Sequence, residues 1–291
     1  MIHSVYASTP FKFVVCGSPY YIHADLASQH SYPLNRMING QMAEAQQGFA
    51  VLEDVDEATF RRFVEWAYKG YYKAADFELD ATISPSTVPS DQKECETTGR
   101  TEGHPPDDLS AGELDQPGPS TESPTELGSE IFKQGKKARK SKTSRELRES
   151  FLRREYTIRR EVISIPQTRP SRGVHEDYTE VFLSHARLYV FAEKYDIQPL
   201  KTLALEELHR TLAVYNLHRQ RTGDIIALLR YVYANTVVST RGGEDLRTLL
   251  KDYVGYEMST LMKDKEFGEL MLEDGGALLR DFMKAVAKRL T

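Results

Sequence analysis

The stretch FKFVVCGSPYYIH, residues 11–23, decides the fold of the first part of this chain. Phe11, Phe13 and Val15 alternate with more variable positions, which is the period of a β-strand with one buried face. Gly17-Ser18-Pro19 predicts a turn, and YYIH (20–23) then completes a short β-hairpin. We therefore expect a small sheet to organise the residues that follow.

Two short helices are expected directly after the hairpin. Residues 24–31 (ADLASQHS) predict a brief helix. Pro33 can start a second helix, because the backbone N–H that proline lacks would have no hydrogen-bond partner in the first turn. Asn39-Gly40 ends the second helix, and Gly40 is expected to adopt the left-handed conformation that closes many helices.

The next elements complete a small unit. Residues 49–55 (FAVLEDV) are a strand candidate. Asp56 is placed to cap the helix that follows, which has one apolar stripe and ends at Gly70. Residues 71–77 (YYKAADF) are a further strand candidate. The order β-β-α-α-β-α indicates a unit that is too short for parallel crossovers of full length.

Composition separates an insert from the folded parts. Of the 291 residues 40% are hydrophobic and 28% are charged. Residues 79–134 are acidic, rich in Ser, Thr and Pro, and contain almost no aromatic residue. Ordering such a stretch costs about 1–2 kcal/mol per residue in backbone entropy with little apolar area to offset it. We therefore expect a disordered insert whose Ser-Pro pairs are either phosphorylation sites or ordinary linker sequence.

The segments around this insert have different characters. Residues 8–78 form the expected core unit, and residues 135–178 are a basic linker that is partly helical. Residues 179–291 are expected to be helical. The periodic segments in that part are 183–197, which is apolar on nearly every side, 200–212, 224–234, 244–258, 267–272 and 277–290.

Bulk properties exclude several classes of protein. The 38 basic and 43 acidic residues give a net charge of −5, so we do not expect nucleic acid as a partner. Cys16 and Cys95 form no disulfide framework and no metal-ligand spacing, which favours a reducing, intracellular location in the cytoplasm, the nucleus or both. The first residues do not read as a signal peptide, and no run approaches the roughly 18 apolar residues of a membrane helix.

Several short motifs, each weak alone, are specific in their order and spacing. They are His23 with Ser31, Leu34-x-x-Met37-x-Asn39-Gly40, Met42-x-Glu44-Ala45, residues 51–56 (VLEDVD), Thr59-Phe60-x-x-Phe63-x-x-Trp66-Ala67-Tyr68-x-Gly70, and residues 185–195 (HARLYVFAEKY). With these motifs the chain resembles the BTB/POZ domain proteins that are abundant in filamentous fungi. The resemblance implies an α+β fold with a short three-stranded sheet and a helical cluster, followed by a C-terminal helical extension and interrupted by the insert.

The same resemblance gives a role to Met42 and Glu44. In BTB adaptors that recruit a cullin ubiquitin-ligase scaffold, a hydrophobic-x-Glu motif in this loop helps to dock the cullin. Met42 is then expected to fill an apolar pocket and Glu44 to orient the contact by its charge. The alternative is structural: Glu44 caps or solvates a helix end while Met42 packs on Leu34 and Ile38.

A basic run follows the acidic insert at residues 136–142 (KKARKSK). Its cations are Lys136, Lys137, Arg139, Lys140 and Lys142. This run is a candidate nuclear-import signal, a nucleic-acid contact, or the solvated start of a polar helix. Nucleic-acid binding is the weakest of the three, because no aromatic residue is interleaved with these cations.

No catalytic constellation is visible in the sequence. The eight histidines show no metalloprotease spacing, no glycine-rich phosphate loop follows a strand, and we expect neither a cofactor nor a metal. His23 and His185 are expected to be buried hydrogen-bonding residues, and Trp66 is expected to fill the core or a domain interface. We therefore expect a non-enzymatic protein–protein interaction module, either a cullin adaptor or a homo- or hetero-oligomeric scaffold or nuclear regulator. An enzyme is the third hypothesis, and for this chain it would rest on a bound cofactor or metal.

Overall fold

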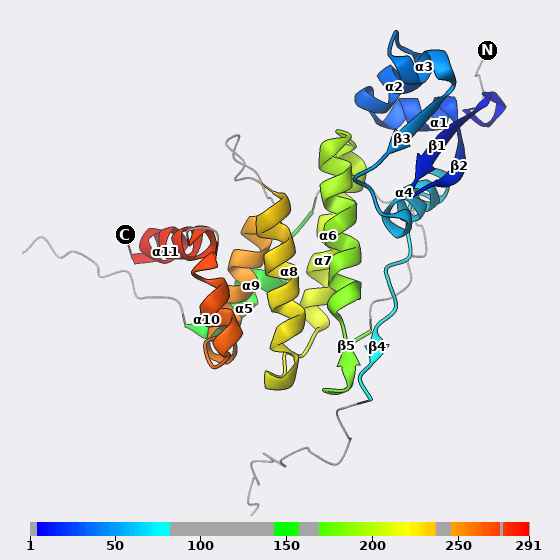
Figure 1. Cartoon of the computed structure of the whole chain (residues 1–291). Coiled ribbons are helices and arrows are strands. Elements are labelled where there is room, and N and C mark those ends of the chain that lie inside the picture. The colour runs from blue at the N-terminus through cyan, green and yellow to red at the C-terminus, as the bar shows by residue number, and fades with distance from the viewer. Residues whose placement is uncertain (1–4, 82–142, 157–168, 237–245, 274–275, 291) are drawn as a thin grey trace, which may run out of the picture. The chain divides into compact units, whose positions relative to one another are not determined.

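The computed structural model in Figure 1 describes residues 5–81, 143–156, 169–236, 246–273 and 276–290. It is mixed α+β and mostly helical, which confirms the fold class at this coarse level. The first region contains a 3₁₀ turn at Val5–Ala7, β1 (Pro10–Val15), β2 (Ser18–His23), α1 (Ala24–His30), α2 (Tyr32–Asn39), α3 (Ala43–Gln47), β3 (Phe49–Leu52), α4 (Glu57–Lys69) and β4 (Glu78–Leu79). The second contains α5 (Ser144–Leu152), β5 (Glu176–Asp177), α6 (Thr179–Lys194), α7 (Gln198–Val214), a 3₁₀ turn at Arg219–Arg221, α8 (Thr222–Asn235), α9 (Leu246–Leu261), α10 (Lys265–Leu270) and α11 (Ala277–Leu290). Across the described ranges, every helix is too short or too polar to cross a lipid bilayer.

β1 and β2 form the expected hairpin, with Val15 paired to Ser18 at its closed end. The loop is Cys16-Gly17, where φ is 48° and 81°. Positive φ at both loop positions is typical of the tight turn that matches the twist of two antiparallel strands. The turn therefore lies one residue earlier than predicted, and Ser18 already belongs to β2.

β3 lies on the other side of β1 and runs parallel to it, which gives the sheet order β2-β1-β3. The prediction that this unit is too short for a parallel crossover does not hold for this pair, because β2 and three helices together supply the connection. The third of these helices, α3, lies in the stretch between Gly40 and β3 where no separate helix was predicted.

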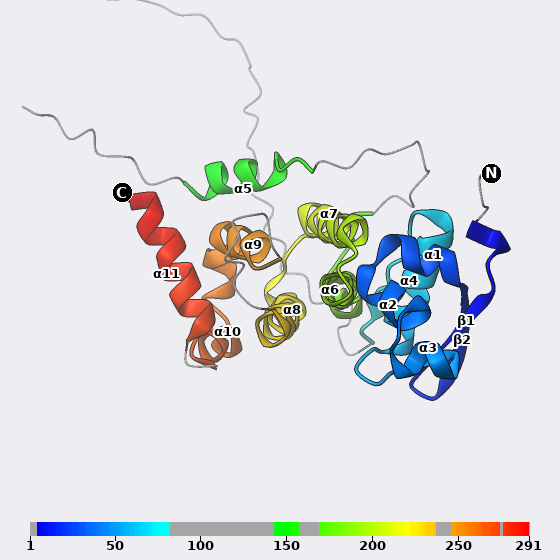
Figure 2. The same cartoon turned by 90° about the horizontal axis from the view of Figure 1, so that it is seen from above.

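The buried face of the sheet packs against helices on one side (Figure 2). The alternating residues Phe11, Phe13 and Val15 are buried, as their spacing predicts. The ring of Phe60 on α4 lies 5.4 Å from that of Phe13 and 5.3 Å from that of Tyr20, centroid to centroid. The aromatic residues of the hairpin and of α4 thus form one core.

Helix ends follow the predicted signals with one exception. Oδ1 of Asp56 accepts a hydrogen bond from the amide of Thr59 at 2.8 Å, and Gly70 closes α4 with φ of 76°. Gly40 ends α2 with φ of −85°, so the predicted left-handed conformation is wrong. Glycine is required there for space: a Cβ atom at position 40 would lie 2.2 Å from the carbonyl oxygen of Arg36.

The segment after α4 is not the strand predicted at residues 71–77. Its polar groups bond to helices instead of a neighbouring strand. The amide of Ala75 donates to Oγ of Ser184 on α6 at 3.2 Å, and Tyr72 bonds to His185 on α6. The amide of Lys73 donates to Glu65 on α4 at 2.9 Å. Strand pairing begins only at β4, which is antiparallel to β5.

Helix α6 is buried on nearly all sides, as its sequence predicts, although it begins at Thr179 rather than at residue 183. Its Phe191 ring lies 5.0 Å from Phe63 on α4. At its C-terminal end, the hydroxyl of Ser31 donates to the carbonyl oxygen of Tyr195 at 2.6 Å. The sheet and the helices after the insert therefore share one hydrophobic core, and α7 and α8 pack beside α6.

Candidate functional site

The two partner-binding candidates, Met42 and Glu44, lie at the start of α3. Met42 is the residue that precedes the helix, with φ of −75° and ψ of 160°, and its side chain is 40% exposed. Glu44 lies in the first turn and is half-buried. A carboxylate is favoured there by the partial positive charge of a helix N-terminus. The helix ends where the amide of Gly48, with φ of 75°, donates to the carbonyl oxygen of Glu44 at 2.9 Å.

Met42 is not part of the buried core, whereas Leu34 and Ile38 on α2 are. A methionine exposed to this extent beside an acidic residue is the type of pair that protein partners contact. The geometry is compatible with both interpretations of Glu44, because a side chain in a first helical turn can stabilise that turn and still reach solvent.

The sheet turns a second, open face away from the helices (Figure 2). Strand register places two rows of three side chains on this side across all three strands, and beyond them Pro10 pairs with His23, which bonds to Tyr68. One row is Tyr21, Lys12 and Phe49, and the other is Pro19, Val14 and Val51. Tyr21 is 62% exposed and Val51 is 53% exposed. We call these six residues the open face.

Lys12 is the only charged residue of the open face, and it stands between two aromatic side chains. Its Nζ lies 5.6 Å from the ring centroid of Phe49, within cation–π distance. No carboxylate among the described residues forms an ion pair with Lys12.

The candidate nuclear-import cations, Lys136, Lys137, Arg139, Lys140 and Lys142, lie outside the described residues. The helix that follows them, α5, is docked rather than free. Its Phe151 is buried, with ring contacts to Tyr253 and Tyr256 on α9 and to His209 on α7. The basic run therefore leads directly into a helix that is fixed on the helical region.

The basic side chains at the start of α5 and just after its end are partly neutralised within the chain. Arg145 and Arg153 pair with Glu149 at 3.2 and 3.8 Å, and Arg154 pairs with Asp252 on α9 at 2.8 Å. These cations already have intramolecular partners, which weakens the case for a continuous nucleic-acid surface along α5.

His23 and His185 both bond to tyrosine hydroxyls. His185 is buried, and its Nδ1 lies 2.7 Å from the hydroxyl of Tyr72, so the expectation of a buried hydrogen-bonding histidine is confirmed. His23 is half-buried, with Nδ1 2.7 Å from the hydroxyl of Tyr68. Trp66 is 6% exposed and lies in the core, as expected. No group of three metal-ligating side chains comes together within the described ranges.

An ion cluster with a buried pair, Arg221 and Asp224, forms where β4 and β5 meet α8. Arg221 contacts Asp224 at 2.6 Å, Asp177 at 2.5 Å and Asp80 at 3.2 Å. Burial raises the pKa of Asp224 even though Arg221 and the amide of Tyr178 counteract it. Asp80 precedes the part of the predicted insert, residues 82–134, that lies outside the described residues. The cluster thus fixes the chain immediately before that segment.

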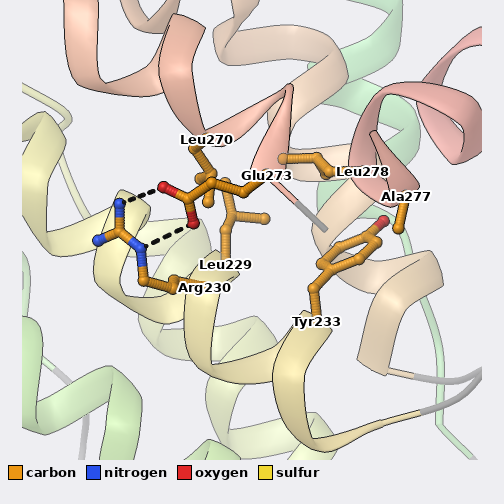
Figure 3. A pocket seen from close by; sticks show the side chains of 7 residues that line it. All are labelled: Leu229, Arg230, Tyr233, Leu270, Glu273, Ala277 and Leu278. Carbon is orange, nitrogen blue, oxygen red and sulfur yellow. Dashed lines mark hydrogen bonds and ion pairs between the residues drawn. The ribbon is translucent and has the colours of Figure 1, made fainter. Parts of the chain in front are cut away.

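A small hollow lies between α8, α10 and α11 (Figure 3). Its volume is about 10 Å³, which is room for about one water molecule. Arg230 closes one side: its Nη2 and Nε bond to Glu273 at 2.9 and 3.1 Å, and this pairing raises the pKa of Arg230. Ligand pockets for metabolites are larger by more than an order of magnitude, so this hollow is a packing feature.

Sequence reasoning missed both the open face and the Arg221 cluster. A signal for the open face was present: Val14 and Val51 are apolar at positions where a strand with one solvated face carries polar residues. For Arg221 the only local signal was Asp224 three residues later, because its other two partners, Asp80 and Asp177, come from distant segments of the chain.

No protein-family model matches the chain, and no curated protein matches it.

Proposed function

We propose that this chain is a non-enzymatic protein–protein interaction module of the BTB/POZ type that acts as an adaptor for a cullin ubiquitin ligase. The observation that carries the proposal is the pair Met42 and Glu44, which stands at the start of a short helix with Met42 40% exposed. The sheet order β2-β1-β3 with its short helices, and the long helices α6 and α7, are compatible with the fold that the resemblance implies.

Met42 and Glu44 would contribute to cullin binding in different ways. Met42 supplies a flexible apolar side chain that can fill an irregular pocket on the partner. Glu44 supplies a charge whose main effect is on orientation and association rate. Contacts of this kind are concentrated in a few residues, so truncating both side chains should remove most of the binding energy.

To test this proposal, binding of the full chain is measured with purified cullins, one at a time. Met42→Ala with Glu44→Ala is expected to weaken binding at least tenfold. The matched control is Gln46→Ala with Gln47→Ala, which alters two exposed residues of the same helix and should leave binding unchanged. Binding that survives the first double variant removes this contact, and no binding to any cullin removes the adaptor role.

The alternative is a homo- or hetero-oligomeric scaffold or nuclear regulator without a ligase role. The open face favours its hetero-oligomeric form, because apolar residues gathered on one sheet face are typical of surfaces that bind another protein. Light scattering of the purified chain tests self-association. A monomer whose cellular location is unaffected by deletion of residues 136–142 would count against this alternative.

A further inference from the structure

The open face contradicts the usual pattern of a sheet with one solvated side. Such strands alternate apolar residues inward with polar residues outward. Here five of the six residues in the two rows are apolar or aromatic; Lys12 is the exception, and His23 in the pair beyond them is polar. The two rows therefore have the sequence of a sheet that is covered on both sides, although the helices that the structure describes cover only one (Figure 2).

The dimensions of the open face limit what can cover it. Three strands about 4.8 Å apart, with two outward residues per strand about 7 Å apart, span about 10 by 7 Å between Cα atoms. An α-helix with its side chains is about 10–12 Å wide. A second copy of the same face would bury far less than the roughly 800 Å² per partner of a stable dimer. One helix is the cover that fits.

The charge of Lys12 on the open face indicates which side chain the covering helix must carry. Lys12 lies in the middle of its row, and no described carboxylate pairs with it. Its Nζ stays over the Phe49 ring rather than turning away to a surface partner. A covering helix would leave this ammonium desolvated and unpaired unless it brings an acidic side chain of its own.

We propose that the open face binds an amphipathic helix of a partner protein, whose apolar side chains cover Tyr21, Val14 and Val51 and whose single Asp or Glu pairs with Lys12. This surface is separate from the Met42–Glu44 pair. The chain would then hold a second protein while α3 contacts the first.

Two synthetic helical peptides of about 18 residues test the proposal with the intact chain. Both carry the same leucine stripe at i, i+3, i+4 and i+7, and they differ only by Glu or Lys within that stripe. Fluorescence anisotropy should show the Glu peptide binding at least tenfold more tightly than the Lys peptide. Lys12→Glu should reverse this preference.

A second variant separates the apolar contribution from the charge. Tyr21→Thr with Val51→Thr keeps two good strand formers at exposed positions, so the fold is expected to persist, as circular dichroism would check. It should weaken the Glu peptide at least tenfold. Met42→Ala with Glu44→Ala is the matched control and should leave peptide binding unchanged, so that the failure of one proposal is distinguishable from the failure of the other.

Four results would overturn the proposal. They are no binding of either peptide, equal binding of both, a dimer in light scattering that Tyr21→Thr with Val51→Thr dissociates, and a carbodiimide cross-link between Lys12 and a carboxylate of its own chain when no peptide is present. The third identifies a second copy as the occupant, and the fourth identifies a segment of this chain.

Discussion

The hydroxyl of Tyr72 lies 2.7 Å from Nδ1 of His185, although the two residues are 113 positions apart. On the other side of the ring, Nε2 lies 3.4 Å from Oγ1 of Thr211, whose hydroxyl donates to the carbonyl oxygen of Glu207 at 2.8 Å. These partners assign a neutral imidazole in which Nδ1 accepts from Tyr72 and the Nε2 proton points to Thr211. The network ties the segment after α4 to both α6 and α7.

Protonation of His185 should destabilise the fold in mild acid. Burial and the nearby Arg62 lower the pKa of His185 to about 3 from its ordinary value of 6.5. A histidine with a lowered folded-state pKa contributes stability that is complete above pH 6.5 and is lost as the pH falls toward 3. The free energy of unfolding should fall by up to about 1.4 kcal/mol per pH unit from this group. Urea unfolding at pH 7, 6 and 5 measures the slope.

The variant His185→Gln is the control for this slope, since it removes the titrating group. Burial also lowers the pKa of His209, which adds a smaller dependence of the same sign that the variant retains. An unchanged slope in His185→Gln would show that His185 does not drive the acid sensitivity.

Tyr72→Phe should destabilise the protein by about 1–3 kcal/mol, because it removes the donor to a buried nitrogen without changing the shape of the ring. Tyr71→Phe is the neighbouring control. Tyr71 is half-buried, its ring lies beneath the ammonium of Lys69, and its substitution should stay within about 0.5 kcal/mol of the parent. Thermal and urea unfolding of both variants measure the difference, and equal losses would contradict a specific role for the Tyr72 hydroxyl.

Arg221→Met should be the most damaging of these substitutions, with a loss of about 3–5 kcal/mol, because it leaves Asp224 buried without its cation. Arg219→Met, in the same 3₁₀ turn but exposed, is the control and should be nearly neutral. Adding Asp224→Asn to Arg221→Met should recover part of the loss, since the uncompensated charge is removed. Additive effects of the two substitutions in urea unfolding would contradict the direct pairing.

Local signals in the sequence predict most of the first region, because each depends on a few neighbouring residues. The alternation of Phe11, Phe13 and Val15 defines the inner face of β1, and the carboxylate of Asp56 caps α4 as its position suggests. The hairpin turn was displaced by one residue because Cys16 adopts positive φ, which few residues other than glycine do. Sequence alone gives little warning of such a conformation.

Contacts between distant segments are where prediction fails. Residues 71–77 have the composition of a strand, but side chains of α4 and α6 bond to their polar groups instead. Neighbouring residues also do not predict the exposure of Met42, because it depends on where α3 begins in the fold. The role of Met42 and Glu44 follows from the resemblance and remains a prediction.

Gly40 offers a clean comparison with another glycine of the chain. Gly40→Ala should destabilise the protein by about 1–3 kcal/mol, because its Cβ would stand 2.2 Å from the carbonyl oxygen of Arg36 and the backbone at the end of α2 must shift. Gly268→Ala, within α10, places its Cβ in open space and should stabilise the protein by about 0.5–1 kcal/mol through helix propensity. Urea unfolding of the two variants should therefore give shifts of opposite sign. Since α2 leads directly to Met42, loss of cullin binding in Gly40→Ala but not in Gly268→Ala would also show that the end of α2 positions α3.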